Sequence, residues 1–257
     1  MPSPDASIAI LDRLGLEEDR LDTLNPQALR VLDGLWMDRT DPTNPQPRKG
    51  GHLTRIKSAV LHNLVTAFQP SRTIEIGLLL GASAMVIMAA AQREGYLGHF
   101  AMDPAQNTHA KGAGLENIVE AGLKPLFTFL EIESCYGLPY LIINASPTFD
   151  FAFIDASHHF DHTLLEFFYL DRMVPVGGVI AFDDIKTPAV EAVINYVAAN
   201  RHYVCRRVGG LVCAIKMADD LRHWFEFNRF EIPDGAAFMQ KKYTDSGKTP
   251  RLKSYKS

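Results

Sequence analysis

Residues 73–83 read TIEIGLLLGAS, and this stretch decides the fold. Its first four residues are apolar or β-branched around one glutamate, a pattern typical of a short buried strand. Gly77 and Gly81 follow, where a tight turn lets a ligand approach the backbone and the next helix leaves its first N–H groups free. Leu79 stands where a dinucleotide-binding GxGxxG motif needs glycine, so the turn predicts a ligand site of another kind. The alternative is a tight turn that serves packing alone.

Strand and helix patterns continue to alternate after this turn. Such alternation predicts a parallel sheet covered by helices on both faces. Gly209 and Gly210 join the last two apolar stretches, as in a hairpin. We therefore expect an α/β fold: a doubly wound, mostly parallel, seven-stranded Rossmann-like sheet with a final antiparallel hairpin strand, and a ligand site at the C-terminal ends of its strands. The strands are expected at 73–76, 99–102, 126–132, 149–154, 178–182, 203–208 and 211–216, and the helices at 82–93, 110–121, 136–144, 162–173 and 188–200.

Two further segments flank this core. Asn25 and Pro26 are typical of the cap and first residue of a helix, and apolar spacing predicts a longer helix over 54–68. Three prolines in residues 41–47 predict a linker between these two helices. The expected organisation is a helical N-terminal segment that serves as a lid or subunit contact (1–47), a ligand-binding core (48–216) and a C-terminal extension with a basic tail (217–257).

The composition limits the function classes. The chain has 257 residues, of which 47% are hydrophobic and 22% charged, as in ordinary globular domains. A formal net charge of −4 argues against a general nucleic-acid binder, and the basic tail is interpreted as solvated rather than as an RNA contact. Three cysteines without metal-site spacing favour a reducing compartment. We expect a cytoplasmic protein with a small-molecule partner and without membrane or nucleic acid; a homo-oligomer stays open.

Polar residues also follow the next two expected strands. Asp103 ends the second strand, where a carboxylate can accept hydrogen bonds from two ribose hydroxyls. Residues 131–134 end the third strand, near the place of a nucleoside base. Together with the turn after residue 76, these strand ends predict one nucleoside-sized crevice.

This arrangement resembles the class I S-adenosylmethionine (SAM)-dependent methyltransferases over residues 50–216. The E-x-G-x-x-x-G-x-S form of residues 75–83 is similar to the metal-dependent small-molecule branch, which contains catechol, caffeoyl-CoA and macrolide-sugar O-methyltransferases, and to the cephalosporin hydroxylase-like proteins. The resemblance implies SAM as cofactor and makes residues 48–216 the SAM-binding methyltransferase core. The implied cofactor contacts are Glu75, Gly77 and Ser83 (methionine part), Asp103 (ribose), Ser134 (adenine), Gly81 and Asp155.

Acidic residues end the fourth and fifth expected strands. Asp155 follows one strand, and Asp183 and Asp184 follow the other. Because neighbouring strands lie about 4.8 Å apart, these three carboxylates can converge on one cation. Oxygen ligands suit Mg²⁺ better than zinc, so we predict a magnesium site, and the resemblance implies the same ligands. The alternative is that Asp183 or Asp184 caps the following loop or pairs with Lys186.

His158 lies three residues beyond Asp155 and is the candidate general base. An imidazole titrates near neutral pH and can take a proton from a substrate hydroxyl. By the resemblance, sugar-type relatives place His at this offset and catechol-type relatives place Lys. We therefore predict His158 and Asp155 as the catalytic residues. The alternative is a capping or surface histidine, since His159 and His162 are close by.

Together these residues predict a SAM-dependent methyltransferase that methylates a hydroxyl of a small molecule with the help of Mg²⁺. The first expected acceptor is a natural-product sugar, and the second is a catechol. One alternative is a SAM-binding protein of the cephalosporin hydroxylase-like type with lost or different chemistry. Another is an NAD(P)-dependent oxidoreductase, which shares the fold but uses the glycine fingerprint that is missing here.

Overall fold

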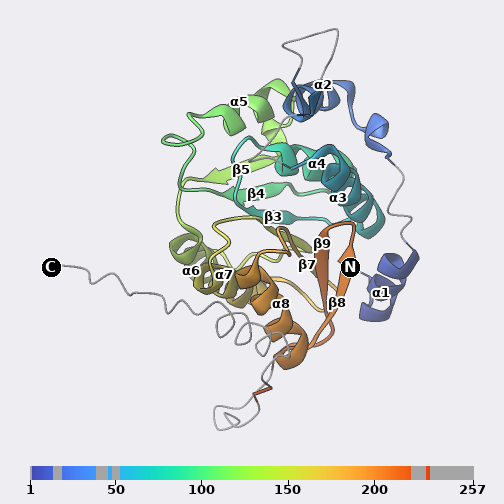
Figure 1. Cartoon of the computed structure of the whole chain (residues 1–257), viewed down its shortest axis with the longest axis vertical. Coiled ribbons are helices and arrows are strands. Elements are labelled where there is room, and N and C mark those ends of the chain that lie inside the picture. Colours follow the sequence, from blue (N-terminus) through green and yellow to red (C-terminus); the bar gives the residue numbers. More distant parts are fainter. Residues whose placement is uncertain (1, 14–18, 39–45, 48–52, 221–229, 232–257) are drawn as a thin grey trace, which may run out of the picture.

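The computed structural model describes residues 2–13, 19–38, 46–47, 53–220 and 230–231. Its centre is a seven-stranded sheet with the order β5-β4-β3-β6-β7-β9-β8 (Figure 1). The first five strands in this order are parallel, and β9 runs antiparallel to both of its neighbours. This confirms the expected fold class. The strands are β3 (Thr73–Ile76), β4 (His99–Met102), β5 (Phe127–Leu130), β6 (Phe151–Ile154), β7 (Val179–Phe182), β8 (Tyr203–Val208) and β9 (Leu211–Lys216).

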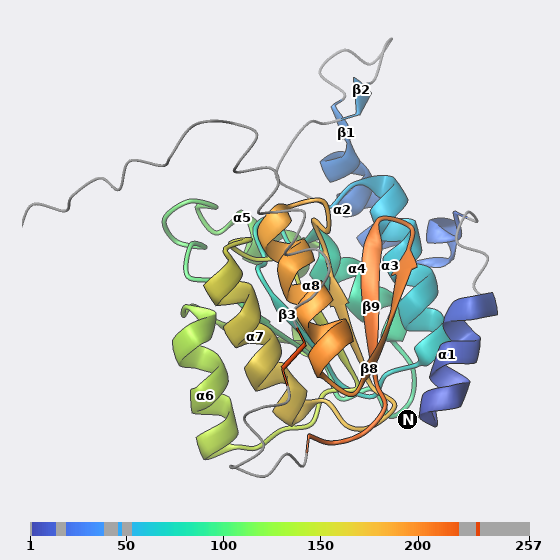
Figure 2. The same cartoon turned by 60° about the horizontal axis from the view of Figure 1, so that its bottom comes forward.

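Helices cover both faces of the sheet (Figures 1 and 2). Successive strand side chains point to opposite faces, and β6 is apolar on both. Its Phe151 and Phe153 pack with α1 to α5, whereas Ala152 and Ile154 pack with α6 to α8. Two apolar layers therefore hold the strand ends in place. The helices are α1 (Pro4–Arg13), α2 (Pro26–Trp36), α3 (Arg55–Phe68), α4 (Ala82–Ala91), α5 (Ala113–Glu120), α6 (Ser134–Asn144), α7 (Phe160–Met173) and α8 (Pro188–Asn200), with short 3₁₀ turns at Leu21–Thr23 and Lys124–Leu126.

The expected boundaries are confirmed for β3, β4, α8 and the hairpin of β8 and β9. The other helices and strands begin or end a few residues from the expected positions. The helix expected over 110–121 begins only at Ala113, because Lys111 and Gly112 have positive φ angles of 52° and 79°. The strand expected over 126–132 ends at Leu130, and α6 begins at Ser134, two residues before the expected start. This early start brings Ser134 to the first position of the helix.

α2 begins after its predicted cap, and α3 begins one residue after the predicted first residue, Thr54, which caps it instead. The Asn25 side chain accepts a hydrogen bond of 2.8 Å from the Ala28 N–H, and Thr54 caps α3 through the Lys57 N–H at 3.3 Å. In the stretch expected as a linker, β2 (Gln46–Pro47) pairs with β1 (Met37–Asp38). The basic tail and most of the C-terminal extension lie outside the described residues. The division into three parts remains a prediction. None of the described helices is long and apolar enough to cross a bilayer.

Candidate active site

A cavity of about 790 Å³ opens at the C-terminal ends of β3, β4, β6 and β7. The turn after β3 forms its floor. Gly77 has φ 93°, and a Cβ there would lie 2.1 Å from the Asp155 carbonyl oxygen, so only glycine fits. Gly81 has φ 75° and precedes α4; it supports the turn without lining the cavity. Ala82 and Ser83 do line it, at the helix end where backbone N–H groups lack intrahelical partners.

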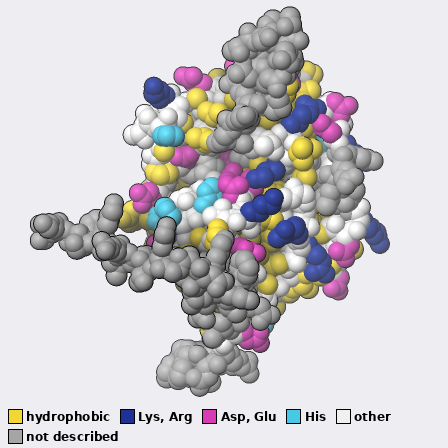
Figure 3. Space-filling model, in the orientation of Figure 1, with side chains coloured by type: hydrophobic (Ala, Val, Ile, Leu, Met, Phe, Trp, Pro, Cys, Tyr) yellow, Lys and Arg dark blue, Asp and Glu magenta, His cyan; other side chains and the backbone are white. Residues whose placement is uncertain are grey.

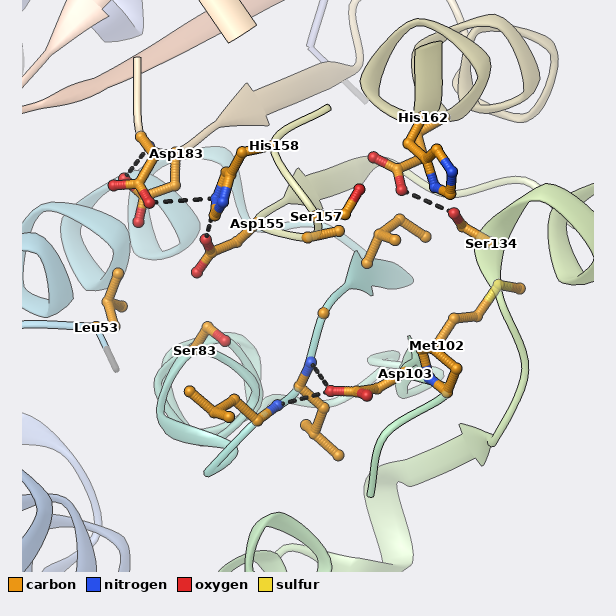
Figure 4. Close-up of a pocket in the computed structure, with 18 of the residues that line it drawn as sticks. Leu53, Ser83, Met102, Asp103, Ser134, Asp155, Ser157, His158, His162 and Asp183 are labelled. Atoms are coloured by element: carbon orange, nitrogen blue, oxygen red, sulfur yellow. Dashed lines mark hydrogen bonds and ion pairs between the residues drawn. The ribbon is translucent and has the colours of Figure 1, made fainter. Parts of the chain in front are cut away.

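Asp103 holds this turn. Its Oδ2 accepts hydrogen bonds of 2.9 Å from both the Leu78 and the Leu79 N–H, and its Oδ1 accepts one of 2.7 Å from the Ala105 N–H (Figure 4). The carboxylate nevertheless lines the cavity, so it stands where a ribose was expected. Its second task, clamping the glycine turn, was missed from the sequence.

Glu75 lies behind the cavity wall. It is fully buried in β3 and is not among the residues that line the cavity, although the sequence placed it against the cofactor. Both carboxylate oxygens lack a hydrogen-bond partner among the described residues, and His99 Nε2 lies 3.5 Å from Oε1. Burial raises the pKa of Glu75, against the opposing effects of His99 and Ser83. An unpartnered buried acid behind Ser83 fits a ligand that brings an ammonium group or ordered water.

Ser134 and Glu166 form one end of the cavity. Ser134 Oγ donates a hydrogen bond of 2.7 Å to Glu166 Oε1, and both residues line the cavity. Glu166 comes from α7 and is only 2% exposed. Its burial raises its pKa to about 7, while Ser134 and the charge of His158 act in the opposite direction. Sequence reasoning predicted Ser134 and missed Glu166, because a lone glutamate inside a helix looks like a surface residue.

The predicted catalytic residues meet at the other end. His158 Nε2 lies 3.4 Å from Asp155 Oδ1 and 3.2 Å from Asp184 Oδ2 (Figure 4). His158 itself has φ 57°, which turns its ring towards these acids from the loop after β6. The nearby Asp155 carboxylate is the main cause that raises the pKa of His158 above its usual value, while burial acts in the opposite direction.

Lys57 from α3 also reaches this end, although no pattern in the sequence marks it. Its Nζ lies 2.5 Å from Asp183 Oδ1 and 3.2 Å from Asp184 Oδ1. Burial lowers the pKa of Lys57, but the bonds and charges of the two acids outweigh it, so its pKa is raised. The pairing with Lys186, which was the alternative for these acids, is thus replaced by one with a residue more than a hundred positions away.

We call Asp155, His158, Asp183, Asp184 and Lys57 the acid cluster. Figure 3 shows histidine, acidic and basic side chains side by side in the middle of this face. Ligand atoms of Asp155, His158 and Asp184 lie within 4.8 Å of one another, whereas Asp183 is engaged by Lys57. Two of the three predicted ligands, Asp155 and Asp184, thus lie together with His158, whereas the third, Asp183, is paired with Lys57. Three carboxylates and one ammonium leave two negative charges, which suits one divalent cation with oxygen ligands.

Comparison with known proteins adds a domain assignment. Residues 74–185, from β3 to β7, match the family model described as "Methyltransferase domain". A curated relative, Tapetum-specific methyltransferase 1 of Arabidopsis thaliana, is 32% identical over 130 residues. That match covers 50% of this chain and 52% of the plant protein, so the chain spans about half the length of this relative.

Solved structures share the fold at low sequence identity. An O-methyltransferase from Bacillus cereus in complex with SAH superposes with a TM-score of 0.58 and 16% identity over 82% of this chain and 97% of that one. The O-methyltransferase TomG from Streptomyces achromogenes in complex with SAM superposes with a TM-score of 0.55 and 17% identity, covering 85% of this chain and 100% of TomG. SAH-bound PaMTH1 of Podospora anserina superposes with a TM-score of 0.59 and 16% identity, covering 76% of this chain and 89% of PaMTH1.

Proposed function

We propose that this chain, whose residues 74–185 match a methyltransferase domain model, transfers the methyl group of SAM to a hydroxyl of a small molecule. One observation carries the proposal: a single cavity joins a nucleoside-type end, with Asp103 and Ser134, to the acid cluster with His158. The SAM- and SAH-bound structural neighbours support the choice of cofactor. All three cysteines are free, which supports a reducing compartment such as the cytoplasm.

The cofactor would lie along the strand ends. The turn at Gly77 and the first N–H groups of α4 would receive the methionine part, with Glu75 behind the cavity wall next to Ser83. Asp103 Oδ1 accepts one hydrogen bond in the described structure, from the Ala105 N–H, and so keeps acceptor capacity for ribose hydroxyls. The methyl group would then face the acid cluster.

His158 would act as the general base. In the transfer, the bond between the acceptor oxygen and the methyl carbon forms, the carbon–sulfur bond breaks, and the hydroxyl proton passes to the His158 imidazole. Asp155 and Asp184, whose carboxylate oxygens lie 3.4 and 3.2 Å from Nε2, would hold the ring and stabilise the imidazolium. The walls of the cavity would align oxygen, carbon and sulfur, which supplies much of the rate acceleration.

Mg²⁺ is the second part of the proposal. Asp155 and Asp184 would hold it, with Asp183 joining when Lys57 gives way. A bound Mg²⁺ would lower the pKa of an acceptor hydroxyl. Two adjacent hydroxyls bind such an ion better than one, so a natural-product sugar is our first acceptor and a catechol our second.

Calorimetry tests the cofactor. We expect the full chain to bind S-adenosylhomocysteine (SAH) and to ignore NADH and NADPH. Binding of a nicotinamide cofactor without SAH would overturn the proposal in favour of an oxidoreductase. Once an acceptor is found, full activity in a chelator would refute the Mg²⁺ part while leaving methyl transfer intact.

A further inference from the structure

Glu166 is a buried carboxyl group without a role in methyl transfer. It is 2% exposed, yet it lines the cavity, so its side chain lies at the inner wall rather than at the mouth. Its one hydrogen bond in the described structure comes from Ser134 Oγ at 2.7 Å. A carboxylate has room for several further donors, so Glu166 has acceptor capacity left for a ligand.

The place of Glu166 in the cavity indicates which part of a ligand it meets. Figure 4 shows Asp183 and His158 on one side, Ser134 on the opposite side and Asp103 between them and below. If the methyl group faces His158 and the ribose faces Asp103, the base extends towards Ser134. Met102, Pro104 and Ala156 contribute apolar lining to the cavity.

We infer that Glu166, held by Ser134, recognises the N6 amino group of the adenine and makes the site selective for a 6-aminopurine. This inference rests on the proposed function. The Glu166 carboxylate accepts a hydrogen bond from the N6 amino group, and the Ser134 hydroxyl keeps the carboxylate in place from the start of α6. A 6-oxopurine presents a carbonyl oxygen to the same carboxylate and leaves two acceptors facing each other in a buried site, which is costly.

The burial of Glu166 accounts for the strength of this selection. A polar group in a site from which water is excluded must be paired by the ligand itself, so the wrong edge is rejected more strongly than on a surface. The pKa of about 7 means that the ionised form, which only accepts, dominates above neutral pH. The test is therefore made at pH 8.

The experiment compares SAH with S-inosylhomocysteine, which carries oxygen in place of the amino group. By calorimetry on the full chain, we expect wild-type protein to prefer SAH by roughly 10- to 100-fold, the cost of a buried unpaired group. Glu166→Leu removes the acceptor and should weaken the binding of SAH, so that the two nucleosides bind with nearly equal affinity. Glu166→Gln should reduce the preference for SAH, because its amide can donate a hydrogen bond to the 6-oxo group.

Glu75→Gln is the matched control, since it changes another buried glutamate on the far side of the turn. It should weaken both nucleosides by the same factor and keep their ratio. A wild-type preference that both Glu166 variants preserve would overturn the inference while leaving SAM binding intact. If wild-type protein binds neither nucleoside, the proposed function fails together with the inference. Thermal unfolding of each variant checks the fold, and the glutamine variant keeps the test decisive if the leucine variant does not fold.

Discussion

Replacing Lys57 by methionine tests the acid cluster most directly. The change keeps most of the side-chain volume and removes the ammonium that lies 2.5 Å from Asp183 Oδ1 and 3.2 Å from Asp184 Oδ1. Asp183 is 4% exposed and would be left as a buried charge without its cation. Burial and the charge of Asp155 already raise the pKa of Asp183, and Lys57 is the main opposing group.

The magnitude follows from the burial of each partner. A hydrogen bond to a charged group contributes roughly 1.5–3 kcal/mol. The contact with Asp184, which is 47% exposed, adds little because water screens it. We expect a loss of about 2 kcal/mol in the free energy of unfolding, which lowers Tm by roughly 4–8 °C for a domain of this size.

The assay is thermal unfolding with EDTA and with Mg²⁺. Without Lys57 the three carboxylates repel one another more strongly, so Mg²⁺ should raise the Tm of Lys57→Met more than that of the wild type. Lys186→Met, an exposed lysine two residues beyond Asp184, is the control and should match the wild type. A Tm of Lys57→Met that equals the wild-type value in EDTA would refute the reasoning about the ion pair.

Four further outcomes are expected. His158→Ala should lower turnover by roughly 10²- to 10⁴-fold and leave SAH affinity within about twofold. Only the neutral His158 ring accepts a proton, and its pKa is raised. The activity of the wild type should therefore increase with pH, with a midpoint above pH 6.5. Burial raises the pKa of Glu166 from 4.5 to about 7, so the native state binds this proton more tightly than the unfolded state does. As the pH rises from 4.5 to 7, the free energy of unfolding of the wild type should therefore fall relative to that of Glu166→Gln. Urea unfolding should show a difference of up to about 3 kcal/mol. Gly77→Ala should lower the free energy of unfolding by about 3 kcal/mol and abolish SAH binding. The control, Gly210→Ala, has a similar φ of 95° but lies in open space, so it should lower the free energy of unfolding by about 1 kcal/mol. Equal losses in urea unfolding would contradict the clash with Asp155. Asp155→Ala should remove any stimulation by Mg²⁺ in a turnover assay, and unchanged stimulation would exclude Asp155 as a ligand.

Local patterns in the sequence were sufficient for the architecture. Strand and helix periods follow from each residue's immediate neighbours, so β3, β4 and the hairpin were predicted to the residue. Parallel strands end at one edge of a sheet, so the sequence alone predicts that Asp103, Asp155 and Asp184 line one site. Residues 74–185, which begin in the strand before that turn, match a methyltransferase domain model.

Helix packing decided the rest. Lys57 meets Asp183 across 126 positions, and Glu166 meets Ser134 across 32, because α3 and α7 turn these residues towards the cavity. Nothing within one turn of either helix marks the residue that faces inward, since a charged side chain is normally on the solvent side. The sequence by itself therefore determined the strand ends and their acids, through periodicities of a few residues. Only the tertiary structure decided which distant side chains neutralise those acids and close the site, because that depends on how two apolar layers pack the helices against the sheet.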